Sequence, residues 1–550
     1  MSDLTRDAVV ESLKSGVISV SALGSLNNAA AAPAPSAPRV RKRPKPAETR
    51  VARLTSKRRR RPRRRTAPAD SQLDTLLHSL RWPDLFAVAD AVPEAKPGRP
   101  AEHPPWMHTV FGIMVTACRS KRAAEAFFSN QSVWDLTRKT LEEAWPDHPD
   151  RRVGNIPIRR DHYRRYVDSR LTPSGQEPVG DAFIRTSAEA ALNFGLLDPK
   201  GPGTAANPNP DRVLIGDGTI LPALYRGTLG DCQVDRETGE KAQVRYDPDA
   251  MYYESGDGRS AIGTLWTEVH VRSDHEDERV ALSFAHVASG GDAQSFTNLV
   301  KKIRPLVPGA QAYAYDMAVR GKHINALYNL GLVPLVKVPL ASRKKGGVAP
   351  TARIGTVDAK TVSGKTAPVQ VYAVNGAAGT EFTIAGKKEF VRFDIDKVLF
   401  RGKDGDSGRV YGDYTMPDKA PVPNPLRGAK IRLRLNVTEE DLARRTSRGV
   451  PFNRTEYLRP ILEGSDTWKT AYGRRNDSES SNNNLKRSLF NGRARSVGAD
   501  RQWADMLGFY LHSNLRAAVA HRKRTGDPTG FAPNGPPDPV GSPAAEPQAA

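Results

Sequence analysis

Residues 213–219 read VLIGDGT, a short apolar stretch that ends on an acid. A short apolar run of this kind is typical of a buried β-strand. Two further strands are predicted downstream, GTLWTEVHV at 263–271 and RVALSFAHV at 279–287, joined by the charged turn RSDHEDE. Asp292 then stands where it can cap a helix. The apolar face of that helix comprises Phe296, Leu299, Val300 and Ile303.

A second strand that ends on an acid follows this helix. It reads QAYAYD and covers residues 311–316. A helix over 319–330 and the strand VPLVKVPL at 333–340 come next. Three strands, a helix, a strand, a helix and a strand in this order predict an α/β fold.

The segments on either side have different patterns. Residues 70–200 carry helical periodicity, and helices are predicted over 106–118 and 132–145. Thr186 and Glu189 have the spacing of a capping box, which predicts a helix start at that point. The first helix of this region is indicated by leucines at helical spacing, namely Leu73, Leu76, Leu77 and Leu80. Beyond the α/β part, residues 345–435 look β-rich, and helices are predicted over 474–490 and 500–521.

The charge of the chain is concentrated near its N-terminus. The 550 residues carry a net charge of +22, and residues 39–65 hold 15 Lys and Arg against the single acid Glu48. Such a segment cannot bury a core, so we expect a disordered arm that binds DNA phosphates, with a solvated tail as the alternative. The cations of its densest part are Lys57, Arg58, Arg59, Arg60, Arg61, Arg63, Arg64 and Arg65.

Nucleic acid is a better expected partner than a membrane. No apolar run approaches the roughly 18–20 residues that cross a bilayer, and the N-terminal residues lack the apolar stretch of a secretory signal. The two cysteines, Cys118 and Cys232, form no zinc-binding or disulfide pattern. We therefore expect a cytoplasmic, nucleoid-associated protein that binds double-stranded DNA.

Two acids end predicted strands, Asp217 and Asp316. If these strands are neighbours in one sheet, their carboxylates emerge side by side. Mg²⁺ prefers hard oxygen ligands and keeps several waters, so one or two carboxylates per ion suffice. A site for two-metal phosphoryl transfer needs further carboxylates from other elements. A single Asp at a strand end is more often a turn or helix-cap residue, so these two positions alone do not establish a metal site. The site also requires a third acid.

The third acid lies in the segment 471–490, AYGRRNDSESSNNNLKRSLF. It contains Tyr472, Arg475, Glu479 and Lys486. On one helix that advances about 100° per residue, these four side chains fall within roughly 60° of one another. A face of this composition suits one metal ligand flanked by groups that hold DNA phosphates. The alternative is an ordinary solvated face.

The spacing of Tyr, Arg, Glu and Lys in this segment resembles the signature of the insertion sequence 4 superfamily of DDE transposases. DGT at 217–219 resembles the first-Asp motif of that family, and 315–338 resembles its second-Asp region. The resemblance covers roughly residues 212–521. The chain departs from the family at Met317 and Ala318, where a Gly–Tyr pair often follows the second Asp.

Asp477 competes with Glu479 as the third ligand, and the family spacing favours Glu479. The resemblance implies an α/β fold with a ribonuclease H-like core that a β-rich insertion interrupts. We divide the chain into an N-terminal segment with the disordered arm (1–66), a helical and DNA-binding region (67–205), the first part of the core (206–340), the insertion (341–464), the second part of the core (465–523) and a disordered tail (524–550).

The resemblance also implies an activity, namely DNA cleavage at element ends by water and joining to target DNA by the 3′-hydroxyl. Two Mg²⁺ ions, with Mn²⁺ as a substitute, would be bound by the catalytic residues Asp217, Asp316 and Glu479. Tyr472, Arg475 and Lys486 would contact DNA, and we expect a homodimer on DNA. Two alternatives remain: a transposase-derived DNA-binding protein without catalysis, and a ribonuclease H-like nuclease that cuts without joining.

Overall fold

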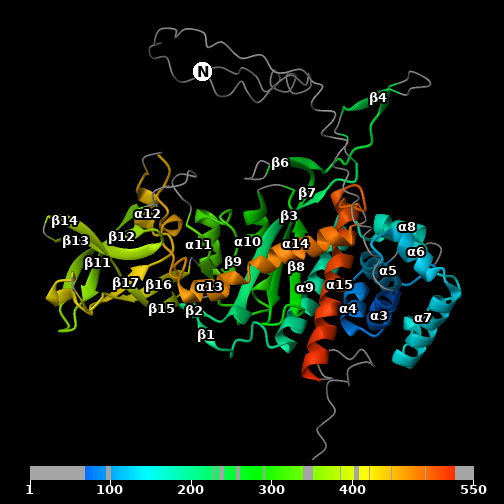
Figure 1. The fold of residues 1–550 in the computed structure, drawn as a ribbon, viewed down its shortest axis with the longest axis horizontal. Helices are drawn as coiled ribbons and strands as arrows, with labels where there is room; N and C mark the ends of the chain where they lie inside the picture. The colour runs from blue at the N-terminus through cyan, green and yellow to red at the C-terminus, as the bar shows by residue number, and fades with distance from the viewer. Residues whose placement is uncertain are drawn as a thin grey trace, which may run out of the picture. The chain divides into compact units, whose positions relative to one another are not determined.

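The structure is a computed structural model, shown in Figure 1. The described residues are 69–94, 101–225, 227, 230–234, 241–254, 260–288, 291–338, 351–384, 386–401, 408–419, 421–446, 449–489 and 491–526. They belong to one compact unit, Thr66–Ala550. A second unit, Met1–Arg65, lies outside the described residues, and so do the basic arm within it and the tail from 527.

A six-stranded sheet forms around β3, with the order β10-β9-β3-β7-β6 and with β8 paired to β7. β3 is parallel to β9 and β9 to β10, whereas β7 is antiparallel to β3, β6 and β8. The strands are β3 (Val213–Pro222), β6 (Met251–Glu254), β7 (Ser260–Arg272), β8 (Arg279–His286), β9 (Ala312–Ala314) and β10 (Val333–Leu335). Short pairs flank this sheet, β1 (Gly203–Thr204) with β2 (Asn207–Pro208) and β4 (Cys232–Val234) with β5 (Lys241–Gln243).

The predicted order of strands and helices is confirmed, and the protein is a mixed α/β structure. α10 (Gly291–Ile303) connects β8 to β9, and α11 (Gly321–Asn329) connects β9 to β10. Parallel strands require such crossover connections, because the end of one strand and the start of the next lie at opposite edges of the sheet. The last strand is shorter than predicted, since the Arg459 guanidinium donates a 2.9 Å hydrogen bond to the Val336 carbonyl just after β10 ends.

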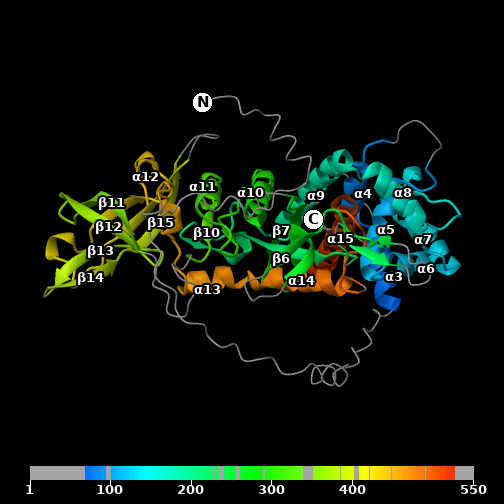
Figure 2. The ribbon, with the colours of Figure 1, turned by 90° about the horizontal axis from the view of Figure 1, so that it is seen from above.

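Helices lie on both faces of this sheet. Figure 2 shows α10 and α11 on one side of the strands and the helices α13 (Asp466–Gly473) and α14 (Asn476–Ser488) on the other. The close approach of α10 requires a glycine at position 216, because an added Cβ there would lie 2.3 Å from the Phe296 ring. The alternation of side chains along β3 then directs Asp217 to the opposite face, toward α14.

The N-terminal region is helical, as predicted. The helix with leucines at helical spacing is α3, and the helices predicted over 106–118 and 132–145 are α5 and α7. The capping box at Thr186 was wrong: α9 runs through this residue, and the Thr186 hydroxyl donates to the Ala182 carbonyl within the helix, at 3.1 Å. The helices are α3 (Ala69–Leu80), α4 (Pro83–Asp90), α5 (Pro105–Ala117), α6 (Lys121–Phe128), α7 (Gln131–Ala144), α8 (Arg160–Arg170) and α9 (Pro173–Asn193), with short 3₁₀ turns at Pro149–Arg151 and Pro210–Arg212.

A second sheet follows β10 and confirms the β-rich character predicted for residues 345–435. Its seven strands have the order β14-β13-β12-β11-β17-β16-β15, and every neighbouring pair is antiparallel. The strands are β11 (Thr351–Lys360), β12 (Thr366–Val374), β13 (Ala377–Ile384), β14 (Lys387–Arg392), β15 (Asp394–Arg401), β16 (Arg409–Thr415) and β17 (Lys430–Arg434). Helix α12 (Glu439–Ala443) and 3₁₀ turns at Asn424–Leu426 and Arg454–Glu456 complete this part.

The chain ends its described part in α15 (Ala499–Thr525), which contacts both α5 and β8. The contact with α5 is close because two glycines face each other. A Cβ added at Gly508 would lie 2.6 Å from the Gly112 carbonyl oxygen. Among the described residues, no helix combines the length and the apolar character that a bilayer crossing requires.

The Gly112–Gly508 contact predicts the effect of one methyl group. Gly508→Ala should lower the free energy of unfolding by about 1–3 kcal/mol, because the methyl group forces two helix backbones apart. Urea unfolding followed by tryptophan fluorescence measures the change. The matched control is Gly180→Ala in α9, where the nearest atom to an added Cβ is 3.7 Å away on Trp503, so stability should stay equal or rise slightly. Equal midpoints for the two variants would contradict the close approach.

Candidate functional site

Asp217 lies on β3, and Asp316 follows the end of the neighbouring parallel strand β9 by two residues. The paired residues of β3 and β9 keep one constant offset along the sequence, and the last pair is Ile215 with Ala314. Two residues further along, the same offset matches Asp217 with Asp316. Neighbouring strands are about 4.8 Å apart, so the two side chains emerge side by side on one face of the sheet. The predicted end of the first strand at Asp217 was wrong, because β3 continues to Pro222 in its antiparallel pairing with β7. Asp316 follows the end of β9 at Ala314.

The two carboxyl groups influence each other's protonation. Burial raises the pKa of Asp217 to about 6, the Arg475 charge opposes this shift, and the Asp316 charge adds to it. Burial also raises the pKa of Asp316, against a 2.7 Å hydrogen bond from the Ala318 N–H, and the Asp292 charge raises it further. Like charges that share a partly dry site disfavour ionisation together. A bound cation would relieve this repulsion.

Helix α14 brings the third predicted acid toward this pair. The Arg475 guanidinium lies 3.5 Å from the Asp217 carboxylate and 3.3 Å from that of Glu479. The Asn482 amide donates a 3.2 Å hydrogen bond to Asp217. The Glu479 side chain is 63 % exposed, so it lies at the rim of the site while the two aspartates lie inside. Arg475 therefore links Asp217 to Glu479.

The competing acid Asp477 has other partners. Its carboxylate lies 2.8 Å from the Arg272 guanidinium and 3.5 Å from that of Arg279. Arg272 ends β7, four residues beyond Glu268, the residue that pairs with Asp217. Asp477 thus belongs to a buried ion-pair cluster with Arg272 and Arg279, separate from the Asp217 carboxylate.

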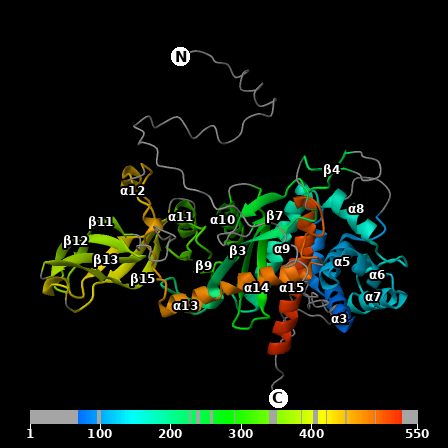
Figure 3. The same ribbon diagram turned by 45° about the horizontal axis from the view of Figure 1, so that its top comes forward.

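One continuous helix over Tyr472–Lys486 was predicted, and this was wrong. α13 ends at Gly473 and α14 begins at Asn476. At the junction, the Arg475 N–H donates to the Tyr472 carbonyl over three residues at 2.8 Å. This tight turn replaces the regular helical bonds, although Figure 3 shows the two helices following each other in nearly one direction. Glu479 and Lys486 keep a common exposed face on α14, and Arg475 occupies the turn.

Tyr472 lies on α13 and stacks on Trp468, with ring centroids 3.9 Å apart and an interplanar angle of 20°. The Lys337 ammonium lies 5.9 Å from the Trp468 ring centroid. Trp468 is partly buried against the core. The pair forms a firm aromatic surface beside Arg475.

Sequence reasoning missed Glu268, which pairs with Asp217 across the β3–β7 ladder. Its side chain is only 2 % exposed and accepts hydrogen bonds from the hydroxyls of Ser481 (3.0 Å) and Tyr510 (2.8 Å). Burial raises the pKa of Glu268 to about 7, with a smaller contribution from the Asp217 charge. A glutamate in the otherwise apolar run TLWTEVHV was the only signal in the sequence. Through these two hydrogen bonds, Glu268 connects β7 to α14 and α15 next to Asp217.

A further acid, Asp292, approaches the site from the other face of the sheet. The Tyr315 hydroxyl donates a 3.2 Å hydrogen bond to it. An added Cβ at Gly218 would lie 2.9 Å from its carboxylate oxygen, so the glycine after Asp217 leaves room for this acid. The sequence assigned Asp292 only to a helix cap, because spacing along the chain does not reveal its place beside Asp217 and Asp316.

Two of the three predicted acids are placed to bind a hard cation, and the third is not. Asp217 and Asp316 offer paired carboxylate oxygens, and Mg²⁺ can be held by one or two carboxylates and water. The three predicted acids do not converge as closely as a closed metal site requires. Within the described residues, the one group of three candidate ligands whose atoms all lie within 4.8 Å of one another is Glu102, His103 and His162. Glu479 would therefore have to turn inward from the rim to join the aspartates.

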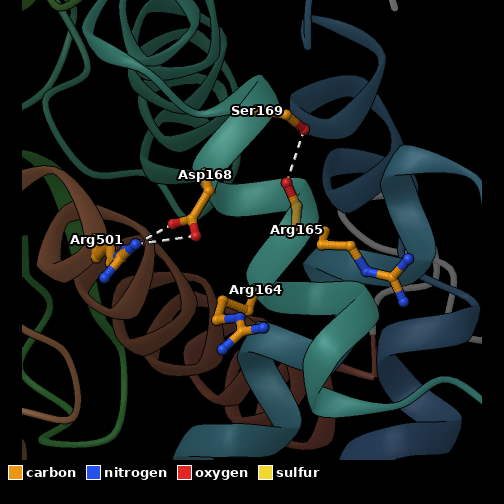
Figure 4. Close-up of a pocket in the computed structure, with 5 residues that line it drawn as sticks. All are labelled: Arg164, Arg165, Asp168, Ser169 and Arg501. Atoms are coloured by element: carbon orange, nitrogen blue, oxygen red, sulfur yellow. Dashed lines mark hydrogen bonds and ion pairs between the residues drawn. The ribbon is translucent and has the colours of Figure 1, made fainter.

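Two hollows near the helical region are lined by basic residues. The first, of about 580 Å³, lies between α8 and α15 and includes Arg164, Arg165 and Arg501, the last of which pairs with Asp168 at 2.6 Å (Figure 4). The second, of about 680 Å³, is lined by parts of α3, α5, α14 and α15. Its basic residues include Arg119, Arg279, Arg487, Arg516 and Lys523. Neither hollow is lined by the predicted carboxylates.

Comparison with models of known protein families and with curated protein sequences gave no match to this chain. The fold and the site therefore define it only as a mixed α/β protein with a half-buried pair of aspartates beside an arginine in the turn before α14.

Glu268 predicts a pH dependence of stability. Its pKa of about 7 in the folded chain lies above the ordinary 4.5, so the folded state holds the proton more tightly than the unfolded state. The stability it contributes is complete below pH 4.5 and is lost as the pH rises through 7. Glu268→Gln should therefore gain stability relative to the wild type over this range, on the order of 3 kcal/mol at most.

Urea unfolding at a series of pH values measures this difference. Glu142→Gln on the exposed face of α7 controls for the loss of one carboxylate. A constant difference between Glu268→Gln and the wild type from pH 4.5 to 8 would contradict the raised pKa.

Proposed function

We propose that this chain is a DDE-type DNA transposase that cleaves the ends of a mobile element and joins them to target DNA. The observation that carries the proposal is the parallel pairing of β3 with β9, whose constant offset matches Asp217 with Asp316 two residues beyond the last paired residues. Arg475 and Glu479 lie beside them on the segment that resembles the transposase signature. Catalysis of phosphoryl transfer needs acids that converge from several elements.

The sheet supports a ribonuclease H-like core. Apart from β6, which also pairs with β7, its strand order is β8-β7-β3-β9-β10, with three antiparallel strands followed by two parallel ones that α10 and α11 connect. The seven-stranded sheet β11–β17 stands in the sequence between β10 and α13. The resemblance implies an insertion at this place, before the helix that carries the third acid.

The roles of the residues follow from their surroundings. Asp217 and Asp316 would hold two Mg²⁺ ions, and Glu479 would join them if its side chain turned inward from the rim. Bound Mg²⁺ supplies a polarised water or hydroxyl and neutralises the charge that develops on the leaving oxygen. The Arg475 guanidinium already reaches both Asp217 and Glu479, so it would pair with a DNA phosphate at the same place.

DNA binding is proposed from charge and exposure. Lys486 is exposed in the last turn of α14, seven residues after Glu479, so both side chains would meet a duplex laid along this helix. The basic hollow between α3 and α15 continues this surface through Arg487. The arm at 39–65 lies outside the described residues, and its charge would add phosphate contacts without sequence preference.

One observation favours the alternative of a non-catalytic DNA-binding protein. Arg475 forms ion pairs with two of the three predicted metal ligands. In a protein that has lost catalysis, such ion pairs would neutralise the carboxylates without a metal ion. Metal-dependent cleavage separates the two functions. Joining of the cleaved 3′-end to a second duplex separates a transposase from a nuclease that only cuts.

The carboxylates should be essential for cleavage. The substrates are duplexes from the DNA that flanks the gene, incubated with the purified chain and Mg²⁺. Asp217→Asn, Asp316→Asn and Glu479→Gln should each lower the cleavage rate by roughly 100-fold or more, because each removes an oxygen that holds the metal. DNA affinity in a gel-shift assay should change little. Asp466→Asn, fully exposed on the neighbouring α13, is the matched control.

Normal cleavage by one of the three variants would remove that residue from the site. Loss of cleavage in Asp477→Asn but not in Glu479→Gln would transfer the third position to Asp477. Absence of any Mg²⁺- or Mn²⁺-dependent cleavage by the wild type, with DNA binding retained, would favour the non-catalytic alternative.

The basic arm should contribute affinity that depends strongly on salt. Deletion of residues 39–65 should weaken binding to unrelated duplexes by equal factors. It should also reduce the slope of log affinity against log salt by about 0.9 for each phosphate that the shortened chain no longer neutralises. Fluorescence anisotropy at several salt concentrations measures both quantities. Deletion of 527–550, which contains no Lys or Arg, is the control. An unchanged slope after deletion of the arm would show that it makes no phosphate contacts.

A further inference from the structure

The helical region contains a buried histidine whose ring makes no hydrogen bond. His103 lies just before α5, and its side chain is 2 % exposed. Within the described part of the chain, neither ring nitrogen of His103 has a hydrogen-bond partner. A buried polar atom without a partner costs about 1–3 kcal/mol. An imidazole in this position therefore indicates a missing ligand.

Two further candidate ligands face this ring. Glu102 precedes His103 in the chain, and His162 lies in the first turn of α8. Nε2 of His162 is 3.2 Å from a carboxylate oxygen of Glu102, and the His103 and His162 ring centroids are 5.1 Å apart. One ligand atom from each of the three residues lies within 4.8 Å of the other two. Three groups from two separate segments thus converge on one point.

The surroundings form a site with a closed floor and one open side. The His103 ring packs edge-on against Trp134, with centroids 6.0 Å apart, and near His108. His108 in turn stacks on Tyr166 at 4.3 Å. Glu102 is exposed, so water can reach the cluster from its side. This aromatic packing holds the His103 ring in a fixed orientation, so that its nitrogens stay in place for a ligand.

The chemistry of the three donors selects the ligand. Two imidazole nitrogens and one carboxylate oxygen match the ligands of Zn²⁺, whereas Mg²⁺ and Ca²⁺ prefer oxygen alone. A set of three leaves a fourth position for water.

We propose that Glu102, His103 and His162 bind one divalent transition-metal ion of the Zn²⁺ type. The ion joins the segment before α5 to the start of α8 and satisfies the buried His103 ring. It is separate from the carboxylates of the candidate active site, and the proposal does not depend on the transposase function.

The test uses the full chain, stripped of metal by a chelator and kept in excess Mg²⁺ so that hard-oxygen sites are occupied. Titration calorimetry with Zn²⁺ should give one site per chain. Thermal unfolding should shift to higher temperature with Zn²⁺ and not with additional Mg²⁺, because only the folded chain assembles the site. Co²⁺ should give the visible absorption of a nitrogen- and oxygen-ligated ion without thiolate bands.

Variants locate the ion. His103→Gln, His162→Gln and Glu102→Gln should each weaken Zn²⁺ binding, by roughly 100-fold or more for the histidines, and should reduce the thermal shift. Glu102→Gln and His162→Gln alter less buried side chains and carry the test if His103→Gln does not fold. His148→Gln, an exposed histidine of the same region, should bind Zn²⁺ as the wild type does. Unchanged binding in the Glu102 and His162 variants, or no stoichiometric binding by the wild type, would overturn the proposal.

Discussion

The rest of the structure depends on the hydrogen-bond ladder of β3. Because β3 pairs in parallel with β9 and antiparallel with β7, it sets Asp217 level with Asp316 on one side and with Glu268 on the other. A slip of one residue in either ladder would turn the acids to opposite faces of the sheet. The register of a single strand therefore decides whether a carboxylate site exists.

Burial and mutual repulsion raise the pKa values of these acids, and groups on the surrounding helices oppose the shift. Each carboxyl group is partly removed from water, and its neighbours disfavour its ionisation. Arg475, Ser481 and Asn482, all from the segment of α14, offset this through an ion pair and hydrogen bonds. The same segment thus stabilises the acids and supplies Glu479, which links folding at this site to its proposed use of metal ions and DNA.

The two proposed metal positions differ in kind. The sheet offers carboxylate oxygens in a place that solvent and a large polyanion can reach, which suits ions that keep their waters. The Glu102, His103 and His162 cluster offers imidazoles on an aromatic floor, which suits an ion that is held permanently. A chain that carries both would use one for chemistry and the other to fix its helical region.

The sequence by itself determined the α/β order, the apolar strands that contain Asp217 or precede Asp316, the leucine-bearing helix α3 and the charge of the arm, because periodicity and composition are local properties. It did not reveal the break between α13 and α14, because a tight turn at Arg475 leaves no mark in the helical spacing. Only the tertiary structure placed Glu268 and Asp292 beside the predicted acids and brought His103 to His162. Contacts across a sheet, or between helices distant in the chain, depend on register and docking, which no spacing along the sequence encodes.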